Sequence, residues 1–306
     1  MAAPDKPALL AFVEALCGTL GSSSTHRAAK LLDHIDGDLS RISPDGLTGP
    51  NSDDLEWATA GLNAIDESRV RFWAESIEKL SRDGVEVITA GIREYPLNLR
   101  LVPNRPPVLF VRGQLLGSDE RAIAVVGTRK ASDKGRAKAA DVAGRLAKAG
   151  VTVVSGLADG IDTIAHRAAL DAGGRTIAVF GTGIDRVFPN SNRELARDVA
   201  RSGACVSQWW PGQGGTRWTF PLRNIVTSGL ALGTVVVEAS ETSGAKLQAE
   251  DARRHGRRLL LLEHLVTSQP WAAALVGEPG VHVVTNVREI IELVALDLDT
   301  ESFSLV

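Results

Sequence analysis

Two glycine turns, each directly after a short apolar run, are the parts of this sequence best suited to bind an anion. After the runs 123–126 and 151–154, they supply Gly127, Thr128, Arg129, Gly156 and Gly160. A turn that opens a helix directs backbone N–H groups and the positive end of the helix dipole toward one place. We therefore expect a phosphate site, for either a nucleotide or a nucleic-acid backbone.

Later motifs add cations and an aromatic ring at further predicted strand ends. They supply the candidate residues Phe220, Arg223, Asn224, Ser243, Gly244 and Lys246. The glycine spacing of a dinucleotide site does not occur in its usual place, and the Gly-Lys-Ser/Thr of a P-loop is absent. Glycines punctuated by Arg129, Arg217, Arg223 and Lys246 favour an extended polyanion over one small cofactor.

Alternating strands and helices must position these turns. Strands are predicted at residues 85–91, 107–113, 123–126, 151–154, 176–180, 205–207, 234–237, 259–262 and 281–284, and helices at 134–149, 161–172, 192–201, 224–231, 244–255 and 287–295. Strands rich in Val, Ile and Leu that alternate with helices indicate an α/β fold with a mainly parallel sheet covered on both faces. Ligands of such sheets bind at the carboxyl ends of the strands.

The first eighty residues have a different, helical texture. Apolar residues recur at helical spacing within 9–20, and further helices are predicted at 25–35, 55–62 and 67–80, with a turn-rich segment at 43–52. The segment between the first two strands is expected to be extended and bounded by prolines. We predict a helical domain over residues 1–83 and an α/β domain over 84–306.

Composition narrows the functional class. The net charge of −3 restricts any nucleic-acid contact to a local patch. Cys17 and Cys205 form neither a disulfide scaffold nor a zinc cluster, and they fit the cytoplasm. A signal peptide and a membrane span are not expected. Asp162 and His166 stand four residues apart on one predicted helix, where a polar contact is favoured over a metal site, so neither a metal nor another cofactor is expected.

Several of these motifs, in this order, resemble the DNA-processing protein A family, also called DprA or Smf. They are GTRxxS, VVSGLAxGIDxxAH, TIAVxGTGIDxxFP, FPxRN and VVVEAxxxSG, preceded by EYPLNLRLVPNRPPVLFVRG. The resemblance spans about residues 85–250. It implies an extended Rossmann-like fold after a small SAM-like helical domain, single-stranded DNA binding, homodimerisation and delivery of DNA to the RecA recombinase.

The resemblance also implies roles for individual residues. Arg129 would pair with a DNA phosphate, Gly127, Thr128, Gly156 and Gly160 would form a backbone cradle, and Phe220 would stack on a base while Arg223 holds a phosphate. The sequence departs from the family at Ile225, at residues 245–248 and after residue 263. No winged-helix domain is expected after Glu292. These departures are typical of a divergent paralogue.

Two other functions stay open at this stage. An enzyme or sensor for a small nucleotide, like the lysine-decarboxylase-like proteins of similar fold, would use Glu238 as a catalytic carboxylate, but the signature of that group is absent after Val237. A partner module of a toxin–antitoxin type is the third possibility. Trp209, Trp210 and Trp218 would either stack on bases or anchor the loop between them, and the basic run 253–258 would either extend a DNA track or end a helix.

Overall fold

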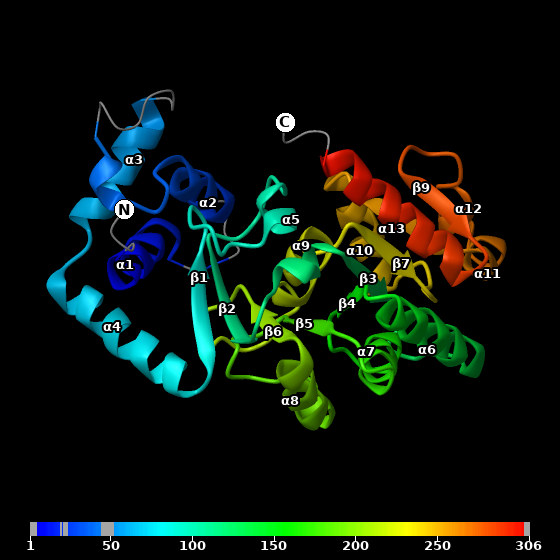
Figure 1. The fold of residues 1–306 in the computed structure, drawn as a ribbon. Helices are drawn as coiled ribbons and strands as arrows, with labels where there is room; N and C mark the ends of the chain where they lie inside the picture. Colours follow the sequence, from blue (N-terminus) through cyan, green and yellow to red (C-terminus); the bar gives the residue numbers. More distant parts are fainter. Residues whose placement is uncertain (1–4, 19, 21–23, 44–51, 303–306) are drawn as a thin grey trace.

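A nine-stranded sheet forms the centre of the molecule (Figure 1). The computed structural model describes residues 5–18, 20, 24–43 and 52–302. The strands are β1 (Val85–Thr89), β2 (Val108–Gly113), β3 (Ala122–Val126), β4 (Thr152–Ser155), β5 (Thr176–Phe180), β6 (Ala204–Ser207), β7 (Gly233–Val236), β8 (Arg258–Leu262) and β9 (Val281–Val284). Their order is β1-β2-β6-β5-β4-β3-β7-β8-β9. β2 runs antiparallel to β1 and β6, and all other pairs are parallel, which confirms the mainly parallel, Rossmann-like sheet.

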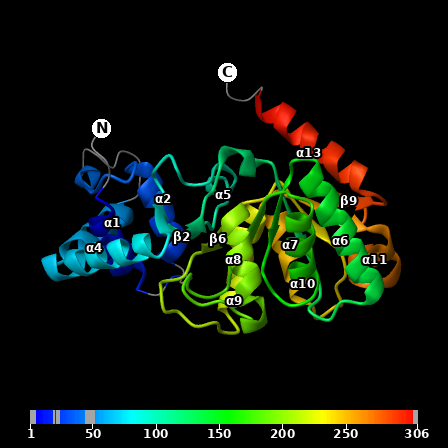
Figure 2. The same ribbon diagram turned by 60° about the horizontal axis from the view of Figure 1, so that its bottom comes forward.

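Helices cover both faces of this sheet (Figures 1 and 2). They are α5 (Leu97–Arg100), α6 (Asp133–Lys148), α7 (Ile161–Asp171), α8 (Arg193–Ser202), α9 (Thr219–Gly229), α10 (Gly244–Arg254), α11 (Glu263–Ser268), α12 (Pro270–Ala273) and α13 (Val287–Ser302). Alternate residues of β8 show the two layers. Leu260 and Leu262 pack in the cluster formed by α6, α7 and α13, whereas Leu259 and Leu261 pack in the cluster formed by α10 and α12. None of the helices in the described ranges is long and apolar enough to span a bilayer.

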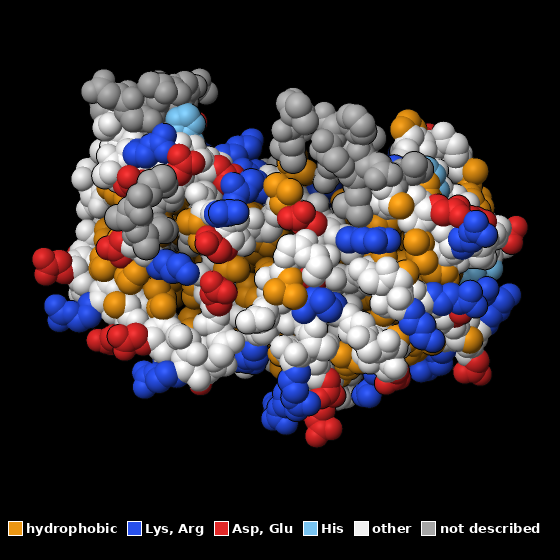
Figure 3. Space-filling view, viewed as in Figure 1, with side chains coloured by type: hydrophobic (Ala, Val, Ile, Leu, Met, Phe, Trp, Pro, Cys, Tyr) orange, Lys and Arg blue, Asp and Glu red, His pale blue; other side chains and the backbone are white. Residues whose placement is uncertain are grey.

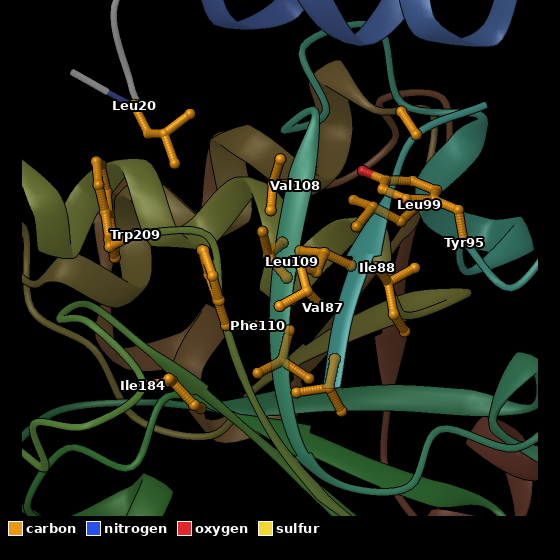
Figure 4. Packing of buried hydrophobic residues seen from close by; sticks show 14 of the residues in the cluster. Leu20, Val87, Ile88, Tyr95, Leu99, Val108, Leu109, Phe110, Ile184 and Trp209 are labelled. Atoms are coloured by element: carbon orange, nitrogen blue, oxygen red, sulfur yellow. The ribbon is translucent and has the colours of Figure 1, made fainter. Parts of the chain in front are cut away.

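The N-terminal helices pack beside the antiparallel end of the sheet. They are α1 (Lys6–Cys17), α2 (Ser24–His34), α3 (Ser52–Asn63) and α4 (Glu67–Arg82). One hydrophobic cluster runs from these helices into β1, β2 and β6, part of which Figure 4 shows around Phe110 and Trp209. The ring of Trp73 lies 4.9 Å from that of Trp210, which lies 5.9 Å from Phe110. Most of the predicted turn at 43–52 falls outside the described residues.

The segment between β1 and β2 is not simply extended as predicted, because it contains the short helix α5. Side chains around α5 donate hydrogen bonds to backbone carbonyls of other segments, and so help to satisfy partly or fully buried acceptors. The Tyr95 hydroxyl donates to Pro106 O at 2.6 Å, and the Asn98 amide donates to Glu120 O at 2.8 Å and to Leu230 O at 3.2 Å. These hydrogen-bond partners are distant in the sequence, so the local proline pattern could not predict them.

Asp33 at the end of α2 joins the helical region to the sheet. Its carboxylate accepts the Gly91 N–H at 2.8 Å and pairs with the Arg105 guanidinium. Gly91 has a φ of +84°, and a Cβ there would lie 2.1 Å from Leu32 O, so only glycine allows this approach. The Arg105 side chain is only 10% exposed, and its Nη1 also donates to Val102 O at 3.1 Å.

We predict that Arg105→Ala lowers the free energy of unfolding by about 2–4 kcal/mol, because it leaves the Asp33 carboxylate without its charged partner. Arg41→Ala is the matched control. Its guanidinium pairs with Asp36, but those side chains are 41% and 61% exposed, so the cost should stay below about 1 kcal/mol. Urea denaturation of both variants measures the difference. Equal costs would contradict the proposed anchoring role of Arg105.

Candidate anion-binding groove

A groove opens where the direction of strand order reverses. From β3 the chain proceeds through β4, β5 and β6 on one side and then returns to place β7 on the other. The carboxyl ends of β3 and β7 therefore border a crevice of the kind that holds ligands in open α/β sheets. A cavity of about 720 Å³ lies there, lined by the predicted site residues Gly127, Thr128, Arg129, Gly156, Phe220, Arg223, Asn224, Ser243 and Gly244. Gly160 and Lys246 are not among its lining residues.

Three backbone N–H groups of the two glycine turns are already occupied by protein acceptors. Thr128 N–H donates to Glu238 O at 2.7 Å, and the Asp162 carboxylate accepts from Gly156 N–H at 3.1 Å and Ala158 N–H at 3.4 Å. Leu157, between the last two, has a φ of +58°. Asp162 therefore braces its turn, and these particular N–H groups are not available to a ligand as the sequence pattern suggested.

The glycines instead provide space for close packing. A Cβ at Gly127 would lie 2.4 Å from the Ile161 side chain, and one at Gly160, whose φ is +81°, would lie 2.3 Å from Thr128 O. A Cβ at Gly156 would lie 1.6 Å from Nη1 of Arg223. These glycines let the turns after β3 and β4 and the helix α9 meet at the bottom of the groove.

Arg223 is held in that packing as a buried cation. Its side chain projects from α9, the residue is 9% exposed, and Nη1 donates to Val179 O at 2.9 Å. Nε has no hydrogen-bond partner among the described residues. Burial lowers the pKa of Arg223 against the opposing charge of Asp162, and burial raises the pKa of Asp162 against the charge of Arg223. The two groups form a buried pair of opposite charges at the groove floor.

The exposed cations of the groove are Arg129, Lys130 and Arg217. Arg129 forms neither an ion pair nor a hydrogen bond through its guanidinium with any described residue, and Asp162 is the one acidic residue that lines the cavity. Lys246 pairs with Glu241 outside the groove. Uncompensated cations around a groove produce a positive potential that attracts anions. The N-terminus of α10, capped by Ser243, adds a partial positive charge.

Phe220 gives the groove an aromatic surface that is fixed in place. Its half-buried ring rests on Gly181 and Gly215, where added Cβ atoms would lie 2.4 Å and 2.7 Å from it. The Arg129 guanidinium lies 5.8 Å from the ring centre, and the exposed ring of Phe188 lies 5.2 Å away. A ring that is already ordered can stack on a base at little cost in conformational entropy.

Phe220 and Arg223 lie on a helix that begins earlier than predicted. α9 starts at Thr219 rather than at residue 224. Pro221 falls in the first turn, where its missing N–H costs no hydrogen bond. Thr216 and Thr219 exchange hydrogen bonds just before it, at 2.9 Å and 3.2 Å.

The three tryptophans of the neighbouring loop divide between the two roles considered for them. Trp218 is 65% exposed and stacks with Arg217, whereas Trp209 is 2% exposed and Trp210 packs on Trp73. Only Trp218 is therefore available to a ligand. The basic run 253–258 lies at the far end of α10, and its Arg253 and Arg254 pair with Glu278 and Asp251.

The Glu238 carboxylate, which the small-nucleotide enzyme alternative would use in catalysis, is hydrogen-bonded to Ser132. Its carboxylate accepts from the N–H and the hydroxyl of Ser132, at 3.1 Å and 3.0 Å, and Ser132 caps α6. A Cβ at Gly135 would lie 1.8 Å from Glu238 Oε2. Because this carboxylate is packed into a helix cap, it is not presented to the groove as a catalytic group would be.

Sequence reasoning missed several lining residues. Lys130, Thr227 and Gln248 all border the cavity. The position of Lys130 directly after Arg129 was a signal for it. Gln248 and Thr227 lie inside helices, and only the packing of α9 against α10 brings them to the groove.

His166 is fully buried on α7 and contacts Thr176 rather than Asp162. The Thr176 hydroxyl donates its proton to Val153 O at 2.7 Å, so His166 Nδ1 must be the donor in its 2.7 Å contact with that hydroxyl. Nε2 has no partner among the described residues. Burial lowers the pKa of His166 to about 3, and the charge of Arg223 contributes to the shift.

The chain is similar to a known protein family and to several curated proteins. A family model described as DNA recombination-mediator protein A matches residues 86–295. Protein Smf of Synechocystis is 36% identical over 190 residues, which make up 61% of this chain and 48% of that protein. The chain spans about half to two thirds of the length of the curated relatives it matches.

Two solved structures have the same fold. The X-ray structure of DNA processing protein A from Streptococcus pneumoniae aligns with a TM-score of 0.74 and 26% identity, over 95% of this chain and 98% of that one. The DNA processing protein A of Helicobacter pylori, whose structure describes a single-stranded DNA binding mode, aligns with a TM-score of 0.62 and 22% identity over 70% of this chain and 96% of that one.

We predict that Gly156→Ala lowers the free energy of unfolding by about 2 kcal/mol or more, because the new methyl group displaces the buried Arg223 guanidinium. Gly244→Ala is the matched control at the same groove. A Cβ there meets no atom within 4 Å, so its effect should stay within about 0.5 kcal/mol. Thermal or urea unfolding distinguishes the two. A Gly156→Ala variant as stable as the control would show that Arg223 can move freely.

We also predict a pH effect that His166→Asn removes. The Asn amide can still donate to Thr176 but does not titrate. Below pH 6.5 the histidine of the unfolded chain binds a proton, whereas buried His166 of the folded protein stays neutral until about pH 3. The stabilisation that neutral His166 gives the folded state is therefore complete above pH 6.5. Below that pH, the free energy of unfolding of the wild type falls by up to about 1.4 kcal/mol per pH unit. Urea denaturation at several pH values should give a steeper decline for the wild type, and parallel curves would contradict this.

Proposed function

This chain belongs to the DNA recombination-mediator protein A family, and on that premise we propose that its groove binds single-stranded DNA. The protein would protect such DNA in the cytoplasm and deliver it to a RecA-type recombinase. The family description and the names of the relatives support a role in DNA processing. The observation that carries the proposal is a groove with three exposed cations, in which the one lining carboxylate is buried against Arg223.

The distribution of charge favours a polymer over a single nucleotide. Arg129 and Lys130 follow β3, whereas Arg217 lies in the loop before α9, so the cations are spread along the groove. Proteins that bind single strands without sequence preference combine such a charged track with aromatic rings on which bases stack. Phe220, which lines the groove, provides such a ring, and the exposed Trp218 lies against the lining residue Arg217.

Individual roles follow from the geometry. Arg129 would pair with a phosphate, and Phe220 would stack on a base. Thr128, Asn224, Ser243 and Gly244 border the path of the strand, and Gly127, Gly156 and Gly160 shape it by allowing close packing. Arg223, which the sequence suggested as a direct phosphate ligand, would act mainly by supporting the floor with its buried charge. Lys246 has no proposed contact, because it pairs with Glu241.

We propose no catalytic step for the groove, and we propose that the protein works as a homodimer. The resemblance to the family supports the dimer and the recombinase partner. β9 forms one edge of the sheet and exposes 39% of Val283. An edge strand with an exposed apolar residue is suited to contact with another chain.

We predict that Arg129→Ala weakens binding of a labelled oligothymidylate about tenfold and reduces the slope of log K against log salt by about 0.7, the value for one phosphate contact on a single strand. Arg145→Ala is the control. Arg145 is similarly exposed but lies in the last turn of α6, away from the groove, and pairs with Asp141. Fluorescence anisotropy over a range of salt concentrations measures both quantities.

The small-nucleotide alternative predicts a different outcome. Wild-type protein would then fail to bind the oligonucleotide at low salt and would release free base from a nucleoside monophosphate. Glu238→Ala would abolish that release. This result would refute the DNA proposal.

A further inference from the structure

A second basic pocket lies beside the groove, between α8, β2 and the glycine-rich loop 212–215. It has a volume of about 470 Å³, and its lining includes Arg112, Arg186, Arg193 and Arg197. We call this cavity, with its four arginines, the arginine pocket. Figure 3 shows Lys and Arg side chains gathered with some acidic ones at the lower edge of the molecule, over α8.

The positive charge of the arginine pocket exceeds the negative charge of its lining, which has four arginines and one acidic residue. None of its four guanidinium groups forms an ion pair with a described carboxylate, and three of the four residues are exposed. Asp185 is the one acidic residue of the lining, and both of its carboxylate oxygens accept the Gly212 N–H, at 2.8 Å and 3.0 Å. Burial raises the pKa of the Cys205 thiol, which also lines the pocket, to about 12, so this group adds no charge.

The pocket adjoins the groove through the aromatic pair. Gly215 lines both cavities, Phe188 lines the pocket, and Phe220 lines the groove, with the two rings 5.2 Å apart. A ligand that leaves the groove past Phe220 therefore meets Phe188 and then the arginines. Arg193 and Arg197 stand one turn apart on α8 and continue the path along the flank of the sheet.

We propose that the arginine pocket binds the phosphates of the same single strand after it has passed over Phe220 and Phe188. The inference rests on the proposed function of the groove and extends it to a longer DNA site that bends around the carboxyl edge of β5 and β6. Guanidinium groups suit this task because each can bind phosphate oxygens in a bidentate manner. If these arginines only kept the protein soluble, they would not need to line the same cavity.

The test compares a short and a long strand. Oligothymidylates of about 5 and about 20 nucleotides represent a strand that fills the groove alone and one that reaches the arginine pocket as well. The double variant Arg193→Ala/Arg197→Ala should bind the long strand about tenfold or more weakly and with a salt slope smaller by about 1.4. Its affinity for the short strand should not change. Thermal unfolding checks that the double variant remains folded.

Two controls separate this inference from the function of the groove. Arg201→Ala changes the next turn of α8, where the arginine pairs with Asp198 outside the pocket, and should leave both affinities unchanged. Arg129→Ala should weaken the binding of both the short and the long strand. If Arg129→Ala has this effect while the double variant binds the long strand like the wild type, the inference is wrong and the groove proposal stands.

Other outcomes overturn the inference for different reasons. If wild-type protein binds neither strand, both proposals fail together. Inorganic triphosphate serves as a probe for a free polyphosphate ligand. If the double variant loses triphosphate binding but retains full affinity for the long strand, the pocket serves a small anion and not the DNA backbone.

Discussion

The groove depends on one close approach, that of the Arg223 guanidinium to the Cα of Gly156. Any larger residue at position 156 would overlap Nη1, so the glycine decides where the cation can lie. Asp162 then balances this charge while its carboxylate accepts the N–H groups of the turn after β4. Removing one member of a buried charge pair lowers the stability of the fold, because the remaining charge is neither paired nor hydrated. The turn after β4, the start of α7 and the middle of α9 are consequently fixed to one another.

This arrangement separates support from recognition. The opposite charges of buried Arg223 and Asp162 offset each other. Arg129 and Arg217 form no ion pair with a described carboxylate and lie instead against the rings of Phe220 and Trp218. Phe220 is likewise packed against Gly181 and Gly215, so its ring is ordered before a ligand binds. Groups that are already in position lose little freedom on binding, so more of their interaction energy appears as affinity.

The sequence predicted the sheet better than it predicted the details of the groove. All nine predicted strands are present, because buried parallel strands have a strong apolar signature. The use of turn N–H groups by Asp162, the burial of Arg223 and the pairing of Lys246 with Glu241 depend on side-chain packing that periodicity does not encode. The arginine pocket could not be predicted either, because its four arginines come from β2, α8 and a loop and share no sequence motif. The predicted boundary between residues 83 and 84 stays a prediction, because the apolar cluster crosses it.

That shared cluster has a consequence for the behaviour of shortened forms of the protein. Val85, Val87 and Ile88 of β1 are buried in the same cluster as residues of α1, α2 and α4. A fragment that began at β1 would turn part of this apolar surface toward water on the outermost strand of the sheet. Exposed apolar strands at a sheet edge promote aggregation. The helical region thus contributes to the solubility of the α/β region, and the two should melt as one cooperative unit.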